Sequence, residues 1–343
     1  MTTVYATHPR YTEHDFPGHP EHAGRIRAVW RGLDESGLRS RMRPLQSHAL
    51  DTDLALAVHT MDYLDLLQRI SAVPRTTFLD ADTYAGPDAL GIARLSAGGV
   101  VGAVEGVLTG TADNGLAAIR PPGHHAMPAR AMGFCLLGNV AIAARHAQTR
   151  YGIERVLIVD YDVHHGNGTE AMFYDDPSVL YVSTHQYPFY PGTGAVTDVG
   201  TGDGEGYTVN IPLPAGSGDG AYTTVFEQIV WPAAARFRPQ LVLASVGFDA
   251  YWADPLAGMR LTLTGYSHIA GEVIRMAQRF CDGKVVFALE GGYDLDALRH
   301  GVCNIARLLL GDSPLDPLGV PPGPAAEPDI DSLVARLKRL HGL

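Results

Sequence analysis

The residues best suited to carry out chemistry lie in one short stretch of the chain, positions 156–168. It begins with four apolar residues, three of them β-branched, which predict a strand that is buried on both faces. Asp160, Asp162 and His164 follow in alternation, so in an extended backbone their side chains point to the same side. Because an unpaired buried carboxylate is very costly, we expect a cation here. A carboxylate and an imidazole two residues apart suit a borderline metal ion such as Zn²⁺.

A catalytic zinc usually has three protein ligands and an open position. Asp162 and His164 supply two, and Asp249, which follows another apolar run, is the best-placed candidate for the third. The alternative for Asp249 is that it only caps a helix or a loop. A two-metal site would need further carboxylates where the chain has Tyr251 and Gly166, so the sequence favours one metal ion.

A pair of histidines forms a second candidate group. His124 and His125 follow Arg120-Pro-Pro-Gly, and after such a turn both side chains can point into one pocket. Two imidazoles beside an activated water can serve as general base and general acid, since histidine titrates near neutral pH. Asp160 and Asn167 are the natural partners for their second ring nitrogens, and a carboxylate raises basicity more than an amide does. On its own, such a pair is as often structural.

A tyrosine completes the candidate chemistry. Tyr293 follows Glu290 and two glycines, and glycines let a backbone pass close to a ligand. A phenol placed there can donate a hydrogen bond to a carbonyl oxygen and to the oxyanion that it becomes. Gly-Gly-Tyr by itself is a common loop.

The pattern of the chain indicates which elements position these residues. Short apolar runs alternate with longer amphipathic stretches, which predicts an α/β fold with a mostly parallel sheet covered by helices on both faces. We expect strands at 116–119, 156–159, 179–183, 208–211, 241–246 and 285–289, and helices near 53–70, 88–109, 138–150, 220–236, 264–280 and 294–310. Polar clusters follow five of these strands, at 120–125, 160–167, 183–185, 249 and 290–293. Ligands bind at the carboxyl ends of strands in such sheets, so we expect one site there.

The remaining segments predict a single domain over residues 1–343. The stretch 186–206 is expected to be a long loop that borders a pocket. The stretch 312–328 contains six prolines and is expected to lie on the surface before a short helix at 329–340.

Composition narrows the class of protein. The net charge of −11 argues against a nucleic-acid partner, which would require a basic surface. Three cysteines without metal-type spacing favour a reducing compartment. The N-terminal residues lack the pattern of a signal peptide, and we find no apolar stretch near the ~20 residues that span a bilayer. We therefore expect a cytoplasmic protein without a membrane partner.

Taken together, the motifs resemble the histone deacetylase family, which includes acetylpolyamine amidohydrolases and acetoin-utilisation proteins. The resemblance runs from His19-Pro-Glu21 to Tyr293. It is carried, in order, by Arg120-Pro-Pro-Gly-His-His-Ala126, Gly133-Phe-Cys135, Asp160-Tyr-Asp-Val-His-His-Gly-Asn-Gly168, Asp254-Pro-Leu256 and Glu290-Gly-Gly-Tyr293. It implies an arginase-like, three-layer α/β fold.

The resemblance also implies a role for each site residue. Asp162, His164 and Asp249 would bind one Zn²⁺ per chain, and His124, His125 and Tyr293 would be catalytic, with Asp160 and Asn167 as the partners of the histidines. A structural K⁺ would be held by Asp160, Asp162, His164, Ser183 and Thr184. Gly133, Phe134 and Tyr190 would line the channel for an acyl-lysine stem, with Leu256 and Asp82 near its rim. Tyr190 departs from the usual phenylalanine and adds a hydroxyl group.

Four positions indicate the place within the family. Asn167 and Glu290 stand where class I enzymes carry Asp and Gly, so the chain resembles class II. Tyr293, rather than the His of poorly active class IIa members, implies a competent enzyme. Polyamine-selective relatives have an acidic residue at position 256, and Leu256 therefore favours acetyl-lysine in peptides or proteins as substrate.

Two rivals remain at this point. The net charge and Asp82 would also suit a small acetylated amine such as an acetylpolyamine. The chain would otherwise be an inactive acyl-lysine binder, which the complete metal set and Tyr293 disfavour. The sequence leaves open the acyl length, a homo-oligomeric state and which histidine donates the final proton.

Overall fold

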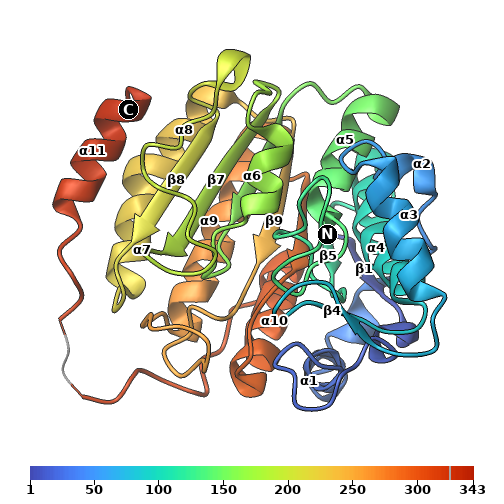
Figure 1. Cartoon of the computed structure of the whole chain (residues 1–343). Helices are drawn as coiled ribbons and strands as arrows, with labels where there is room; N and C mark the ends of the chain where they lie inside the picture. The colour runs from blue at the N-terminus through green and yellow to red at the C-terminus, as the bar shows by residue number, and fades with distance from the viewer. Residues whose placement is uncertain (324–325) are drawn as a thin grey trace.

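The computed structural model describes residues 1–323 and 326–343. Its centre is one sheet of eight parallel strands in the order β2-β1-β5-β10-β9-β6-β7-β8 (Figure 1). The strands are β1 Thr3–Thr7, β2 Arg43–Gln46, β5 Asn114–Ala117, β6 Val156–Asp160, β7 Val179–Gln186, β8 Thr208–Leu213, β9 Leu241–Val246 and β10 Val285–Leu289. A separate antiparallel pair consists of β3 Thr77–Phe78 and β4 Tyr84–Ala85. The central strands β6, β9 and β10 are buried along their whole length, as continuous apolar runs predict.

Helices cover both faces of the sheet, which gives the three layers expected from the sequence (Figure 1). On one face lie α2 Thr52–Ala55, α3 Met61–Ser71, α4 Ala89–Leu108, α5 Asn139–Tyr151 and α6 Asn167–Phe173. On the other face lie α1 Gly24–Glu35, α7 Asp219–Val225, α8 Trp231–Phe237, α9 Leu263–Cys281 and α10 Leu295–Leu310. Helix α11, Asp331–His341, packs beside the turn that joins α7 to α8.

The strand register brings the predicted polar clusters to one edge. Asp160, the last residue of β6, pairs with Ser183 of β7 and with Ser245 of β9. Asp249 comes three residues after the end of β9, and Glu290 follows β10 directly. The carboxyl ends of four adjacent central strands therefore meet where the sequence predicts a site.

All six predicted strands are present, but several elements were missed. The sequence analysis assigned neither β1, β2 nor α1, and it placed β5 two residues too late. Asn114 and Gly115 have low strand propensity, yet they pair with Thr3 and Val4 of β1, so tertiary pairing overrides the local preference.

The helix predictions needed two corrections. The single helix expected at 53–70 is two helices, because Thr60 caps α3 by accepting a hydrogen bond from the backbone N–H of Tyr63. The helix expected at 220–236 contains a π-helical turn, η4 Phe226–Val230, directly before Pro232, which has no N–H to donate.

The two surface predictions hold. The loop between β7 and β8 contains only the short helix η3 Gly202–Gly204. The described part of 312–328 lacks helix and strand and is exposed or partly exposed, whereas residues 324 and 325 lie outside the described residues.

The expectation about apolar stretches was wrong for α4. This helix has 20 residues, and an 18-residue window within it has a mean hydropathy of 1.3, so by length and composition it could cross a bilayer. In the structure, 67% of that window is buried, and α4 packs against α5 and β5 as a core helix.

Candidate active site

Asp162, His164 and Asp249 converge at the carboxyl edge of the sheet. One ligand atom of each residue lies within 4.8 Å of the other two, and all three residues are buried. The Nδ1 atom of His164 lies 3.1 Å from Oδ1 of Asp162 and 3.2 Å from Oδ2 of Asp249. Two carboxylates and one imidazole at this spacing form a donor set that Zn²⁺ accepts.

The hydrogen bonds around this group also fit a cation. Oδ2 of Asp162 accepts from the backbone N–H of Gly291 at 2.8 Å, and Oδ1 of Asp249 accepts from that of Val163 at 2.9 Å. Oδ2 of Asp249 is buried, and among the described residues it has no hydrogen-bond partner. Burial and the nearby charge of Asp162 raise the pKa of Asp249. A divalent ion would supply the missing partner and offset the repulsion between the carboxylates.

Two glycines make room for these carboxylates. A Cβ on Gly291 would lie 2.2 Å from Oδ2 of Asp249, and a Cβ on Gly247 would lie 2.1 Å from Oδ2 of Asp162. The sequence analysis recognised the need for small residues at the Gly-Gly-Tyr motif but missed Gly247. Any side chain at either position would displace the predicted ligands.

The tandem histidines have the partners that the sequence predicts. Nδ1 of His124 lies 3.1 Å from Oδ2 of Asp160, and Nδ1 of His125 donates to Oδ1 of Asn167 at 2.8 Å. The two rings are 4.0 Å apart between centroids, and both are buried. The carbonyl of His124 accepts from the backbone N–H groups of Gly168 and Thr169 in the first turn of α6, so this helix fixes the histidine backbone.

The different partners set the two histidines apart electrostatically. Burial alone would lower the pKa of His124, but the carboxylates of Asp160 and Asp162 outweigh it and raise this pKa to about 10. Burial and the positive charge of His124 lower the pKa of His125 well below its usual value, and Asn167 provides no charge to oppose this. The pair therefore favours one protonated and one neutral imidazole near pH 7.

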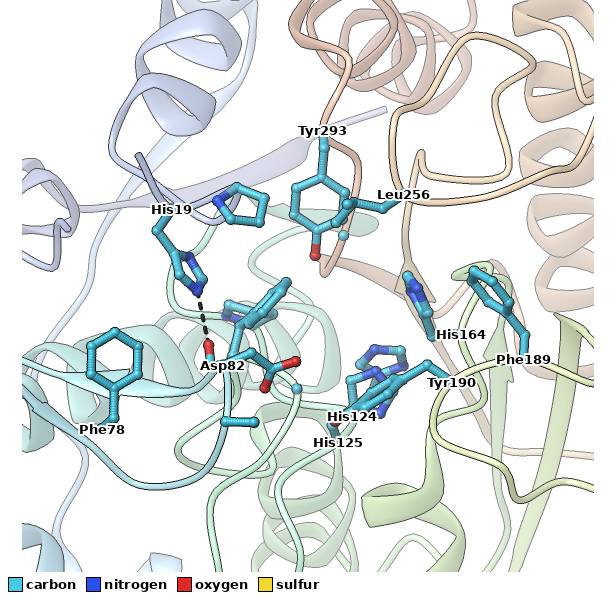
Figure 2. A pocket seen from close by; sticks show the side chains of 16 residues that line it. His19, Phe78, Asp82, His124, His125, His164, Phe189, Tyr190, Leu256 and Tyr293 are labelled. Atoms are coloured by element: carbon cyan, nitrogen blue, oxygen red, sulfur yellow. Dashed lines mark hydrogen bonds between the residues drawn. The ribbon is translucent and has the colours of Figure 1, made fainter. Parts of the chain in front are cut away.

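Tyr293 lies across the cavity from the histidines. Its hydroxyl points toward the space between His124 and His164 (Figure 2). Oδ2 of Asp254 accepts from its backbone N–H at 2.7 Å, and the Arg25 guanidinium lies 4.9 Å from its ring centroid. Burial raises the pKa of Tyr293 well above its usual value, so the hydroxyl stays protonated and able to donate.

A buried ion cluster behind Tyr293 was not predicted. Arg25 donates to the carbonyl oxygens of Glu290 and Gly292 at 2.6 and 2.7 Å, which holds the backbone leading to Tyr293. Glu21 binds both Arg25 and Arg120, at 3.0 and 2.5 Å. The sequence analysis quoted Glu21 and Arg120 within motifs but gave them no role.

We expect Glu21→Ala to lower the free energy of unfolding by about 3–5 kcal/mol, because it leaves two buried arginines without their shared carboxylate. Urea denaturation measures this loss. Glu13→Ala is the matched control, since it removes an exposed partner of Arg10 and should cost less than about 1 kcal/mol. Equal costs for the two variants would remove the structural role of the cluster.

The predicted channel residues line one cavity of about 420 Å³ (Figure 2). Its lining comprises His19, Pro20, Phe78, Ala81, Asp82, Pro122, His124, His125, Gly133, Phe134, His164, Phe189, Tyr190, Leu256, Gly291 and Tyr293. All five predicted substrate-contact residues are in this set, whereas Phe78 and Phe189 were missed. Phe189 stacks on His164 with ring centroids 5.6 Å apart.

Individual contacts explain the shape of this channel. A Cβ on Gly133 would lie 2.3 Å from Cδ2 of His125, so glycine is required there. Phe134 and Tyr190 contact the site edge-on, Phe134 against Tyr293 at 5.9 Å and Tyr190 against His125 at 5.3 Å between centroids. The carbonyl of Asp82 accepts from His19 at 2.8 Å, and its half-buried carboxyl group has a pKa raised by burial and by Asp80.

One of the residues predicted to bind K⁺, Asp160, is also the partner of His124. Asp160 is the last residue of β6, Ser183 and Thr184 lie within β7, and all three are buried. Asp160 also accepts from the Tyr181 hydroxyl at 3.0 Å. Oγ1 of Thr184 is buried without a hydrogen-bond partner among the described residues. This oxygen-rich group suits a hard cation, and the potassium assignment stays a prediction.

Comparison with known proteins agrees with this geometry. The model of the Histone deacetylase domain family matches residues 19–309. "Histone deacetylase 14, chloroplastic" of Arabidopsis thaliana is 41% identical over 319 residues, which cover 88% of this chain and 75% of the relative. A "Probable deacetylase" of Archaeoglobus fulgidus is 40% identical over 315 residues, or 91% of this chain and 87% of the relative.

Two further relatives bear on substrate and fold. "Polyamine deacetylase HDAC10" of Mus musculus is 41% identical over 307 residues, covering 86% of this chain and 45% of the relative. The crystal structure of the HDA15 HD domain superposes with a TM-score of 0.90 at 36% identity, covering 99% of this chain and 94% of the solved one.

Proposed function

Since this chain belongs to the histone deacetylase family, we propose that it hydrolyses the amide of N6-acetyl-lysine in peptides or proteins and releases acetate. The observation that carries the proposal is the meeting of three groups at one cavity of about 420 Å³. These are the Asp162–His164–Asp249 donor set, two histidines with unlike partners and the hydroxyl of Tyr293. The family relation supports deacetylase activity, and we propose N6-acetyl-lysine as the substrate and Zn²⁺ as the metal.

Asp162, His164 and Asp249 would hold one Zn²⁺ per chain. When bound, such an ion polarises a carbonyl oxygen and lowers the pKa of water toward about 7. Asp160, Ser183 and Thr184 would hold a structural K⁺ together with oxygens of Asp162 and His164. We further propose that the whole chain acts as one deacetylase domain.

The residues of the chain then divide the proton transfers. His125 carries a proton on Nδ1, where it donates to Asn167, so Nε2 is free to accept the proton of the attacking water. The water oxygen bonds to the amide carbon, and Tyr293 donates to the resulting oxyanion. His124, protonated beside Asp160, donates to the lysine nitrogen as the C–N bond breaks and acetate leaves.

The residues at the cavity rim favour peptides over polyamines as substrates. The apolar residues Phe78, Leu256 and Phe189 lie around the cavity (Figure 2), and Pro20 also lines it. A polyamine carries further ammonium groups, and those groups would lose water against this surface. Among the described residues that line the cavity, Asp82 is the one acidic side chain. Its presence, together with the relative named a polyamine deacetylase, favours acetylpolyamines as the second candidate substrate.

The test compares kcat/KM for an acetyl-lysine peptide and for N-acetylated polyamines with the same zinc-loaded protein. We expect a clear preference for the peptide. Leu256→Glu should narrow that preference by adding a second carboxylate at the rim, while Asp82→Asn should widen it. A preference for polyamines in the unaltered protein would overturn the substrate assignment.

We expect activity to fall at alkaline pH, because His124 must be protonated to act as the acid. Asp160→Asn removes the carboxylate that raises the pKa of His124, so activity should fall at lower pH than in the unaltered protein. The measurement is the pH profile of kcat, with the exposed Asp175→Asn as control. If the alkaline limb of this profile does not move to lower pH in Asp160→Asn, the result would contradict the role given to His124.

A further inference from the structure

The oxygen and the nitrogen of the Asn167 side-chain amide each have a suitable hydrogen-bond partner. Oδ1 accepts from His125, while Nδ2 lies 3.1 Å from Sδ of Met127 and 3.2 Å from Sδ of Met132. A thioether sulfur is a weak acceptor and has no hydrogen to donate. The two sulfurs therefore match the nitrogen end of the amide and not its oxygen end.

The backbones of both methionines are held by hydrogen bonds. Met127 donates to the carbonyl of Arg130 at 2.9 Å, and the carbonyl of Met132 accepts from Cys135 at 3.0 Å. His59, which lies between α2 and α3, has its Nδ1 3.1 Å from the carbonyl oxygen of Met127. These contacts hold the loop that carries both sulfurs, and the sulfurs lie 3.1 and 3.2 Å from Nδ2 of Asn167 at the start of α6.

Asn167 is held against the same loop. A Cβ on Gly168 would lie 2.3 Å from the carbonyl oxygen of Ala126, so the first turn of α6 packs directly on the residues after His125. The rotation that matters for His125 is a half-turn of the amide, which exchanges its oxygen and nitrogen. The two states differ in what they present to His125.

We propose that Met127 and Met132 are positioning residues that fix the orientation of the Asn167 amide and, through it, the tautomer of His125. In the observed orientation His125 carries its proton on Nδ1, and Nε2 can accept a proton. In the reversed orientation the amide N–H₂ faces Nδ1, the imidazole proton moves to Nε2, and the base is blocked. This inference rests on the proposed function, in which His125 is the base.

The methionine pair also accounts for asparagine at this position. An aspartate would place a carboxylate oxygen against two electron-rich sulfurs, whereas asparagine places an N–H donor there. A carboxylate has two equivalent oxygens, so a half-turn of the group presents the same acceptor to His125. Activity should therefore depend on the two methionines when residue 167 is asparagine and should not depend on them when it is aspartate.

The experiment is a double-mutant cycle on the acetyl-lysine peptide. The variant Met127→Leu/Met132→Leu keeps side-chain volume and removes both sulfurs. In the Asn167 background we expect kcat/KM to fall about tenfold, since part of the general-base contribution is lost. In the Asn167→Asp background the same two substitutions should change kcat/KM by less than about twofold. Met172→Leu, at a buried methionine, is the control.

A second readout follows the tautomer itself. In ¹⁵N spectra of histidine-labelled protein, assigned by comparison with His125→Gln, the unaltered protein should show His125 protonated on Nδ1. The Leu/Leu variant should show a mixture that includes Nε2–H. Equal costs in the two backgrounds, or an unchanged tautomer in the Leu/Leu variant, would overturn the proposal. If His125→Gln retains full turnover, the base assignment fails separately, and the spectra still decide the methionine role.

Discussion

Replacement of Asp249 by alanine should abolish zinc binding and deacetylation together. Asp249 provides one of three candidate ligands, and its Oδ2 lies 3.2 Å from His164 with no hydrogen-bond partner among the described residues. Two ligands, Asp162 and His164, would remain, fewer than the three that catalytic zinc sites usually have. Metal analysis after dialysis against zinc should give about one ion per chain before the change and close to none after it.

The control for this variant is Asp282→Ala, which removes an exposed carboxylate at the end of α9. It should keep both zinc and turnover. Stoichiometric zinc in Asp249→Ala would show that the ligand set is wrong, whatever happens to activity.

Tyr293→Phe should lower kcat by about 10²–10³-fold with little change in KM, as for the loss of one oxyanion donor. The phenyl ring would keep its contacts with Arg25 and Phe134, so the change removes the hydroxyl alone. Because the hydroxyl acts on charge that develops during the reaction, the loss belongs in kcat.

Tyr190→Phe is the matched control for Tyr293→Phe. It removes a hydroxyl from the same cavity, but Tyr190 is a wall residue that is 37% exposed. We expect less than about a threefold change in kcat, as for a group that contributes no oxyanion bond. An unchanged rate in Tyr293→Phe, or equal losses in the two variants, would remove the oxyanion role.

The predicted site could be located from sequence because parallel strands end at a common edge. Asp162 and Asp249 are 87 residues apart, yet each follows a continuous apolar run closely, and this alone predicts that they meet. The partners of the histidines were predictable for the same reason, since Asp160 and Asn167 flank the same strand end.

The supporting residues could not be found this way. Glu21 and Arg120 are 99 residues apart, and Glu21 precedes a helix that the apolar pattern did not reveal. Gly247 is required only because of where the Asp162 carboxylate lies, which is a tertiary property. The contacts of Met127 and Met132 with Asn167 likewise depend on how a loop packs on the start of α6.

The local errors in the fold have similar causes. Strand β1 begins at residue 3 and has a threonine at each end, and β2 contains a proline, so neither gives a clear apolar run. Helix α6 begins inside the motif whose polar residues were assigned to chemistry, which concealed its helical pattern.

The most direct test of the account is acetate release from an acetyl-lysine peptide by metal-free protein as zinc is added. We expect no turnover without metal and a rise that saturates at about one equivalent of zinc, which is the content of a single three-ligand site. Undiminished turnover by the metal-free protein, or binding of the peptide without acetate release at full zinc occupancy, would contradict it.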